Sequence, residues 1–124
     1  MTTPTGRDLD VELARLMGWT KIDLGGDGEP VGNPPGEFGW KKSIPAYRTS
    51  LDALFAPGGP VEYARNKGLR FSLDWSPDLQ YEGAIFRDRE GLVMRYAAGP
   101  AEALATALHE AFMKEQGQEM NDAE

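Results

Sequence analysis

The chain has 124 residues, of which 40% are hydrophobic and 27% charged, the size and composition of one globular domain. It contains no cysteine, which excludes disulfides, thiolate metal sites and cysteine nucleophiles, and its net charge of −7 argues against non-specific binding to DNA or RNA. No apolar run approaches the ~18 residues of a membrane span, and residues 1–6 lack the basic and apolar regions of a signal peptide. We therefore expect a cytoplasmic protein that does not bind membranes.

Amphipathic spacing predicts a first helix over residues 7–17. Four apolar side chains recur at intervals typical of one helix face: Leu9, Leu13, Leu16 and Met17. Thr5 and Asp8 stand at the spacing of a capping box, and Gly18 is a typical C-terminal stop. Trp19 follows and is expected to fold back onto the core.

Residues 20–46 are rich in glycine and proline, with six glycines and four prolines. A long irregular loop is uncommon in a compact domain and is often functional where it occurs. We expect short extended segments at Thr20–Leu24 and around Phe38–Lys42, with a mobile stretch between them. The Gly25–Gly28 run lacks the Lys and Ser/Thr of a phosphate-binding loop, so we interpret it as a surface loop.

An interrupted helical layer is predicted next, starting near Thr49. Asp52 stands at the capping-box position relative to Thr49, and the apolar residues that follow are at helical spacing. Pro57–Pro60 must break this helix, and Pro60 suits the first turn of another helix that Gly68 ends.

Three antiparallel strands are predicted from period-two patterning and turn residues. Leu69–Trp75 alternates apolar and polar residues, and Gln80–Arg87 and Leu92–Ala97 are joined at a hairpin turn, Asp88–Gly91. The run Ala84–Phe86 is apolar on both faces, which predicts that both faces of the sheet are covered.

A final helix is predicted over Pro100–Lys114, followed by a disordered acidic tail at 116–124. Six side chains of the sheet and this helix are expected to be buried: Leu73, Trp75, Ile85, Leu104, Leu108 and Phe112. The pattern as a whole predicts a single α/β domain of the α+β type over residues 1–115. It has a small, mainly antiparallel sheet of three to four strands, packed with about three helices in a sandwich-like arrangement.

Three short segments are similar to motifs of a known family. They are Gly6–Asp10 leading to Met17–Trp19, then Pro45–Asp52, and Gly99–Ala101 at the start of an Ala/Leu-rich helix. With the order of the predicted elements, they resemble the phage ABA sandwich family, although the break at Pro57–Pro60 departs from it. The resemblance implies a phage or prophage accessory protein in the host cytoplasm, with no catalytic residues to transfer.

No motif in the chain marks a catalytic or metal site. His109 is the only histidine, and its place on the last helix predicts a surface or boundary position. Asp8, Asp10 and Glu12 alternate on a helix and point in different directions, so we interpret them as solvated acids that complement the helix dipole. A second acidic group around a turn lacks the ligand order of an EF-hand: Asp74, Asp78 and Glu82.

The best candidate for a ligand site mixes aromatic and basic side chains. Residues 41–95 carry a net charge of +2, whereas the segments before and after carry −4 and −5. Aromatic faces stack on bases or sugars, and Lys and Arg neutralise phosphates. The candidate ligand-binding residues are Trp19, Trp40, Lys41, Lys42, Tyr47 and Arg48. The alternative is that Trp40 and Tyr47 are core residues and that the basic side chains are solvated.

The sequence therefore predicts a non-catalytic binding module that needs no cofactor and no metal. Its expected partner is a host protein or a small anionic ligand. One alternative is a counter-defence protein that sequesters a small anionic nucleotide signal. Another is a structural or minor virion or assembly protein, which would oligomerise through an exposed apolar surface.

Overall fold

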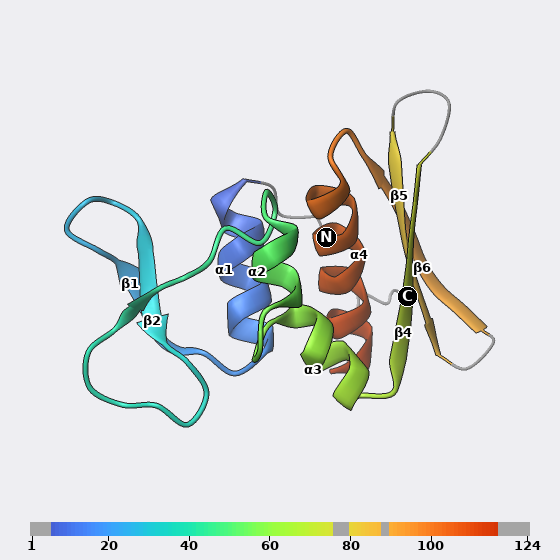
Figure 1. The fold of residues 1–124 in the computed structure, drawn as a ribbon. Helices are drawn as coiled ribbons and strands as arrows, with labels where there is room; N and C mark the ends of the chain where they lie inside the picture. The colour runs from blue at the N-terminus through green and yellow to red at the C-terminus, as the bar shows by residue number, and fades with distance from the viewer. Residues whose placement is uncertain (1–5, 76–79, 88–89, 117–124) are drawn as a thin grey trace, which may run out of the picture.

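Four helices lie between two antiparallel sheets in the computed structural model, which describes residues 6–75, 80–87 and 90–116 (Figure 1). The helices are α1 (Arg7–Leu16), α2 (Leu51–Phe55), α3 (Pro60–Asn66) and α4 (Pro100–Glu115). The larger sheet has the order β4 (Leu69–Trp75), β5 (Tyr81–Arg87) and β6 (Glu90–Ala97). The smaller sheet has the order β1 (Thr20–Leu24), β2 (Pro30–Asn33) and β3 (Lys42–Ser43). The predicted α+β class is confirmed.

The core is centred on α4, which packs across β5 and β6 and also contacts α1, α2 and α3. Small residues let this helix come close to the sheet. A Cβ at Gly83 would lie only 2.6 Å from the carbonyl oxygen of Ala103, so this position of β5 accepts glycine alone. Large, fully buried apolar side chains come from α1, α2, α4 and β5: Leu9, Leu13, Leu54, Ile85, Leu104, Leu108 and Phe112.

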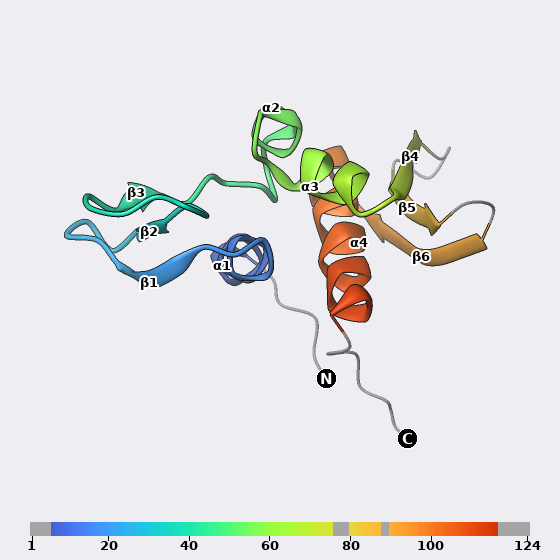
Figure 2. The same cartoon turned by 90° about the horizontal axis from the view of Figure 1, so that it is seen from below.

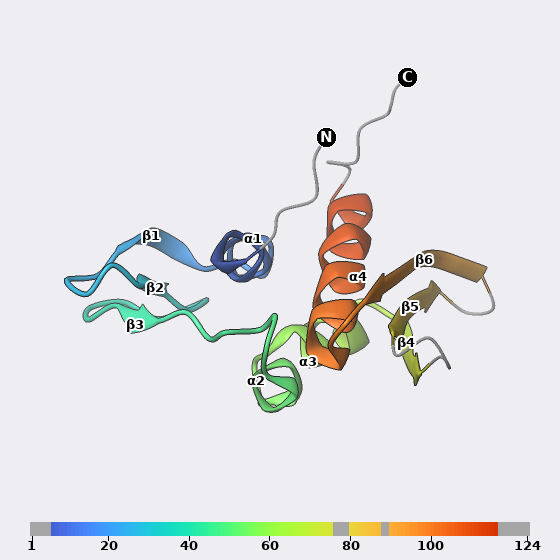
Figure 3. The same cartoon turned by 90° about the horizontal axis from the view of Figure 1, so that it is seen from above.

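Only one face of the β4–β6 sheet is covered by helices, so the prediction of cover on both faces is wrong (Figures 2 and 3). Met94 on the open face is 50% exposed. Ala84 is buried on the same face because it is small and lies on the central strand. The predicted burial of Trp75 is also wrong, since this last residue of β4 is 64% exposed. Leu73 is partly buried against the core, and the other four predicted core residues are buried.

Residues 20–43 form an arm, and the β1–β3 sheet lies within it. Figure 2 shows the arm extending away from the helices on the side opposite to β4–β6. Thr20–Leu24 is extended as predicted, whereas the strand expected around Phe38–Lys42 is replaced by β3 at Lys42–Ser43. The stretch between the two also contains a strand, β2, which pairs with both β1 and β3. The residues of β1 and β3 are mostly exposed and are held by backbone pairing, whereas three of the four β2 residues are buried. These three, Pro30, Gly32 and Asn33, do not form an alternating apolar pattern, which explains why the sequence did not predict β2.

The ends of the helices differ from the sequence prediction in three places. Gly6 is the N-cap of α1 and supplies no side-chain bond, while Thr5 lies outside the described residues. The N-cap of α2 is Ser50 rather than Thr49, and its hydroxyl accepts a hydrogen bond from the Ala53 amide at 3.1 Å. Gln116, predicted to begin the tail, ends α4 and donates to the carbonyl oxygen of Leu16 at 2.7 Å. The rest of the predicted tail, residues 117–124, lies outside the described residues.

Candidate functional site

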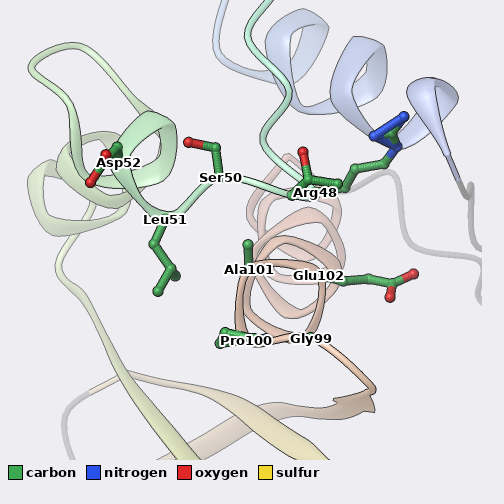
Figure 4. A pocket seen from close by; sticks show the side chains of 9 residues that line it. Arg48, Ser50, Leu51, Asp52, Gly99, Pro100, Ala101 and Glu102 are labelled. Atoms are coloured by element: carbon green, nitrogen blue, oxygen red, sulfur yellow. The ribbon is translucent and has the colours of Figure 1, made fainter.

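Two clefts are built around α2. The first, the helix-end cleft of about 570 Å³, is lined by residues 48–52 and 99–102 at the starts of α2 and α4. In Figure 4 the carboxylates of Asp52 and Glu102 point to opposite sides, and the Arg48 side chain extends toward α1. Between them the cleft presents mainly Leu51 and Pro100. Few polar groups therefore converge on one point where they could orient a ligand.

The second cleft, the Trp19–Tyr47 cleft, measures about 430 Å³ and lies between the arm and α2. Its walls combine the two aromatic side chains with four prolines: Pro34, Pro35, Pro45 and Pro57. The volume falls in the range of small-molecule pockets, about 300–1,000 Å³. Proline rings and aromatic faces are rigid apolar surfaces, so this cleft loses little side-chain entropy when it is filled.

Local backbone contacts set the position of Trp19. Gly18 adopts a left-handed conformation with φ of 105°, which turns the chain at the end of α1. The Trp19 amide then donates to the Ala14 carbonyl at 3.0 Å. Trp19 is half-buried, so part of its side chain packs on the core while part remains accessible in the cleft.

Tyr47 belongs to the strap, residues 44–50, which joins the arm to α2. The strap is fixed to α1 by a buried carboxylate, Asp10, whose Oδ1 accepts a hydrogen bond from the Arg48 amide at 2.8 Å. Arg7 adds three contacts: an ion pair with Asp10 at 2.6 Å, and hydrogen bonds to the Ile44 carbonyl at 2.9 Å and to the Pro45 carbonyl at 3.4 Å. The prediction that Asp10 is solvated is therefore wrong: the residue is fully buried and ties two segments together.

The Tyr47 hydroxyl is the one polar group of the cleft with an unusual environment among the described residues. Tyr47 is only 2% exposed, and its hydroxyl makes no hydrogen bond to any part of the chain that the structure describes. Burial, and secondly the negative charge of Asp10, raise the pKa of Tyr47 to about 12. The side chain is therefore a neutral phenol at physiological pH, able to donate or accept one hydrogen bond.

The basic residues of the predicted site are engaged in ion pairs. Lys42 lies at the edge of the cleft, 2.6 Å from Glu37. Lys41 lies 3.9 Å from Asp23, and Arg48 lies 3.8 Å from Asp10. The cleft therefore has no net positive charge on its described walls.

The structure brings three of the six predicted site residues together in this cleft: Trp19, Lys42 and Tyr47. Trp40 is 94% exposed and lies outside it, as do Lys41 and Arg48. The Trp40 indole is thus neither in the core nor in the cleft. The proline walls were not predicted, and the clustering of proline in residues 30–57 is the only sequence signal that could have pointed to them.

His109 lies outside both clefts, and the prediction of a surface or boundary position for it is wrong because the residue is buried. Its side chain is buried between α4 and α1, with Glu12, Arg15 and Glu110 near it. Burial lowers the pKa of His109, with the two acids opposing and Arg15 reinforcing this effect. Within the described ranges, no three His, Asp or Glu side chains gather closely enough to hold a metal ion.

Comparison with protein-family models, with curated proteins and with solved structures gives no match to this chain. None of the helices described has the length and apolar character needed to cross a bilayer. The geometry of the Trp19–Tyr47 cleft is therefore the main guide to function.

Proposed function

We propose that the protein is a non-catalytic binding module, consistent with a phage or prophage accessory role, and that its ligand occupies the Trp19–Tyr47 cleft. The observation that carries the proposal is the Tyr47 hydroxyl, which has no hydrogen-bond partner among the described residues and lies in the wall of an otherwise largely apolar cleft. The hydroxyl oxygen is not one of the buried side-chain atoms that lack a partner, so it is accessible from the cleft. A ligand that forms a hydrogen bond with it gains the net worth of one neutral hydrogen bond, about 0.5–1.5 kcal/mol, and is oriented by it.

The chemistry of the walls favours a ligand with a flat, uncharged ring and one polar group. The ring would lie against Trp19 and the prolines, where stacking of a base on an aromatic side chain contributes about 1–3 kcal/mol. Its polar group would face the Tyr47 phenol. Because Lys42 and Glu37 neutralise each other at the edge, the cleft does not require a charge on the ligand.

A phosphorylated ligand, such as the nucleotide signal considered from the sequence, needs one further step. Lys42 must leave Glu37 before it can contact a phosphate. Both side chains are at least half exposed, and such surface pairs contribute about 0–1 kcal/mol. The comparison of a nucleoside with its own phosphate therefore measures whether Lys42 takes part in binding.

The experiment is a thermal-shift screen of nucleosides, their 5′-phosphates, cyclic dinucleotides and uncharged aromatic compounds. A ligand at 100 times its Kd stabilises the protein by about 2.7 kcal/mol. Tyr47→Phe keeps the ring but removes the hydroxyl, so it should weaken binding of a hit by about 2–10-fold, the worth of one neutral hydrogen bond. Tyr63→Phe is the matched control, because Tyr63 packs through its ring against Phe112 and lies outside the cleft.

Two outcomes would count against the proposal. If no compound in the panel raises the melting temperature, the cleft is not a small-molecule site and a protein partner becomes the better explanation. If a hit binds equally well to Tyr47→Phe and to the wild type, its site lies elsewhere on the protein.

A further inference from the structure

One side of the larger sheet is covered by none of the described helices and forms an open sheet face made from alternate residues of three strands. Strand register places three rows across it. The rows are Arg70, Phe86 and Gly91 at one end, Ser72, Ala84 and Met94 in the middle, and Asp74, Glu82 and Tyr96 at the other end. Tyr96 is 56% exposed and Met94 50%, so the face leaves large apolar groups in contact with water.

The charges on this face are separated rather than mixed. Arg70 is at one end of β4, while Asp74 and Glu82 are direct cross-strand partners at the other end. Like charges placed directly opposite each other destabilise a sheet. Neither Arg70 nor Asp74 has an ion-pair partner in the part of the chain that the structure describes. The other described arginines of the larger sheet, Arg87 and Arg95, are paired with glutamates of α4.

We propose that a second copy of this chain covers the open sheet face, and that the two copies form a symmetric dimer by stacking these sheets. The two-fold axis runs along the middle row, from Ser72 to Met94. Rotation about this axis lays each strand antiparallel over the same strand of the second copy. Arg70 then faces Asp74 of the second copy, with Glu82 of that copy beside it. The same contact is made twice, as an isologous interface requires.

The same axis also matches large side chains with small ones. Tyr96 of one copy faces Gly91 of the other, where the absence of a side chain leaves room for the ring. The Phe86 ring lies beside Gly91, with 3.7 Å between a Cβ built at position 91 and the ring edge, so it would line the space that Tyr96 fills. An axis parallel to the strands would place Arg70 over Gly91, so that neither Asp74 nor Glu82 would face a basic side chain, and Glu82 would keep only the hydrogen bond from the Tyr96 hydroxyl of its own chain. Charge and shape therefore favour the same axis, the one along the middle row. Sheets that pack face to face in this way lie ~10 Å apart.

The test measures dimerisation by sedimentation equilibrium over a wide concentration range and at low and high salt. The wild type should dimerise, and salt should weaken the dimer because its charges are partly exposed. Arg70→Asp and Asp74→Arg should each weaken dimerisation by about tenfold or more, since each places like charges across the interface. The double swap, Arg70→Asp with Asp74→Arg, restores opposite charges and should recover most of the loss. Arg65→Asp on α3 makes the same change in net charge at a side chain that is 77% exposed, and should have no effect.

The double variant distinguishes weaker dimerisation from misfolding, because a second charge reversal would not rescue a single variant that had failed to fold. A protein that remains monomeric up to about 1 mM would overturn the proposal, because a dimer with a dissociation constant of that size has a binding free energy of only about −4 kcal/mol. A dimer that responds to neither single reversal would also overturn it, since the interface would then lie elsewhere. The ligand screen is independent of this result because the Trp19–Tyr47 cleft shares no residue with the open sheet face.

Discussion

The two sheets have the same number of strands and the same antiparallel pairing, yet different forces hold them. The β4–β6 sheet lies against α4, whose Leu104, Leu108 and Phe112 are fully buried. In the arm, only Ile22 of the five β1 residues is even half-buried, and the buried residues of β2 are Pro30, Gly32 and Asn33. No large aliphatic or aromatic side chain of this sheet is buried, so the sheet depends mainly on backbone hydrogen bonds. Similar topology therefore does not imply similar stability. The larger sheet is stabilised by apolar burial, and the arm depends on a few anchoring contacts at its base.

The largest difference between the two regions is expected in the free energy of unfolding when one leucine in each is replaced by alanine. Leu108→Ala removes a fully buried side chain under the larger sheet and should lower the free energy of unfolding by about 2–5 kcal/mol in urea denaturation. Leu24→Ala in the arm, where the side chain is 68% exposed, should change it by less than about 0.5 kcal/mol. Equal losses in the two variants would mean that the arm is as well packed as the core.

A smaller loss is expected where the two regions are joined. Asp10→Asn removes the charge that pairs with Arg7 and leaves one acceptor oxygen for two donors, the Arg7 guanidinium and the Arg48 amide, so it should cost about 1.5–3 kcal/mol. Amide exchange should also quicken at Arg48. Asp8→Asn is the control, because Asp8 is exposed in the same helical turn and should cost no more than about 1 kcal/mol. A similar cost for both variants would show that Asp10 acts only on the helix dipole and does not hold the strap.

The smallest effect concerns the pH dependence of the helical layer. Because burial lowers the pKa of His109 below 6.5, the unfolded chain binds a proton more readily than the folded one. The contribution of His109 to the free energy of unfolding is therefore constant above about pH 6.5, and it decreases as the pH is lowered through that value. Glu12 titrates in a separate, more acidic window, because its hydrogen bond with Arg15 lowers its pKa.

Denaturation midpoints between pH 7 and pH 5 measure this effect in the wild type and in His109→Gln. The wild type should lose stability over this range, and the variant should show a flatter profile. An identical slope in both proteins would assign the acid sensitivity to other groups and not to the α1–α4 interface.

The sequence predicted the larger sheet and α4 well because those elements bury one face, which leaves a periodic apolar pattern. The bounds of β4 match the prediction, whereas the arm contains two further strands that carry no such pattern. The burial of Trp75 was predicted wrongly. The alternation of apolar and polar residues along a strand shows which side chains share a face, but it does not show how far along the strand the covering helix extends. Both faces of the sheet were expected to be covered because Ala84–Phe86 is apolar at every position. Ala84 is in fact buried because it is small and lies on the central strand.

The candidate site was half predictable for a related reason. Aromatic and basic residues near one another suggested Trp19, Lys42 and Tyr47, and the cleft contains all three. Arg48 was not available because Asp10, 38 residues away in the chain, engages both its backbone and its side chain. Such long-range pairings leave no local signal, and neither does the proline wall, which is supplied by the arm, the strap and the segment between α2 and α3.

The arm is fixed to α1 at both of its ends, so it resembles an insertion that could be replaced without changing the rest of the fold. Before it, the Trp19 amide is fixed to α1, and after it, the Ile44 carbonyl accepts a hydrogen bond from Arg7 of the same helix. The helices and the larger sheet are complete without the residues between these points. Pro34, Pro35 and Lys42 of one cleft wall belong to the arm, whereas Tyr47 belongs to the strap. If the cleft binds a ligand as proposed, changes in the length or sequence of the arm would alter which ligand fits it while the core stays the same.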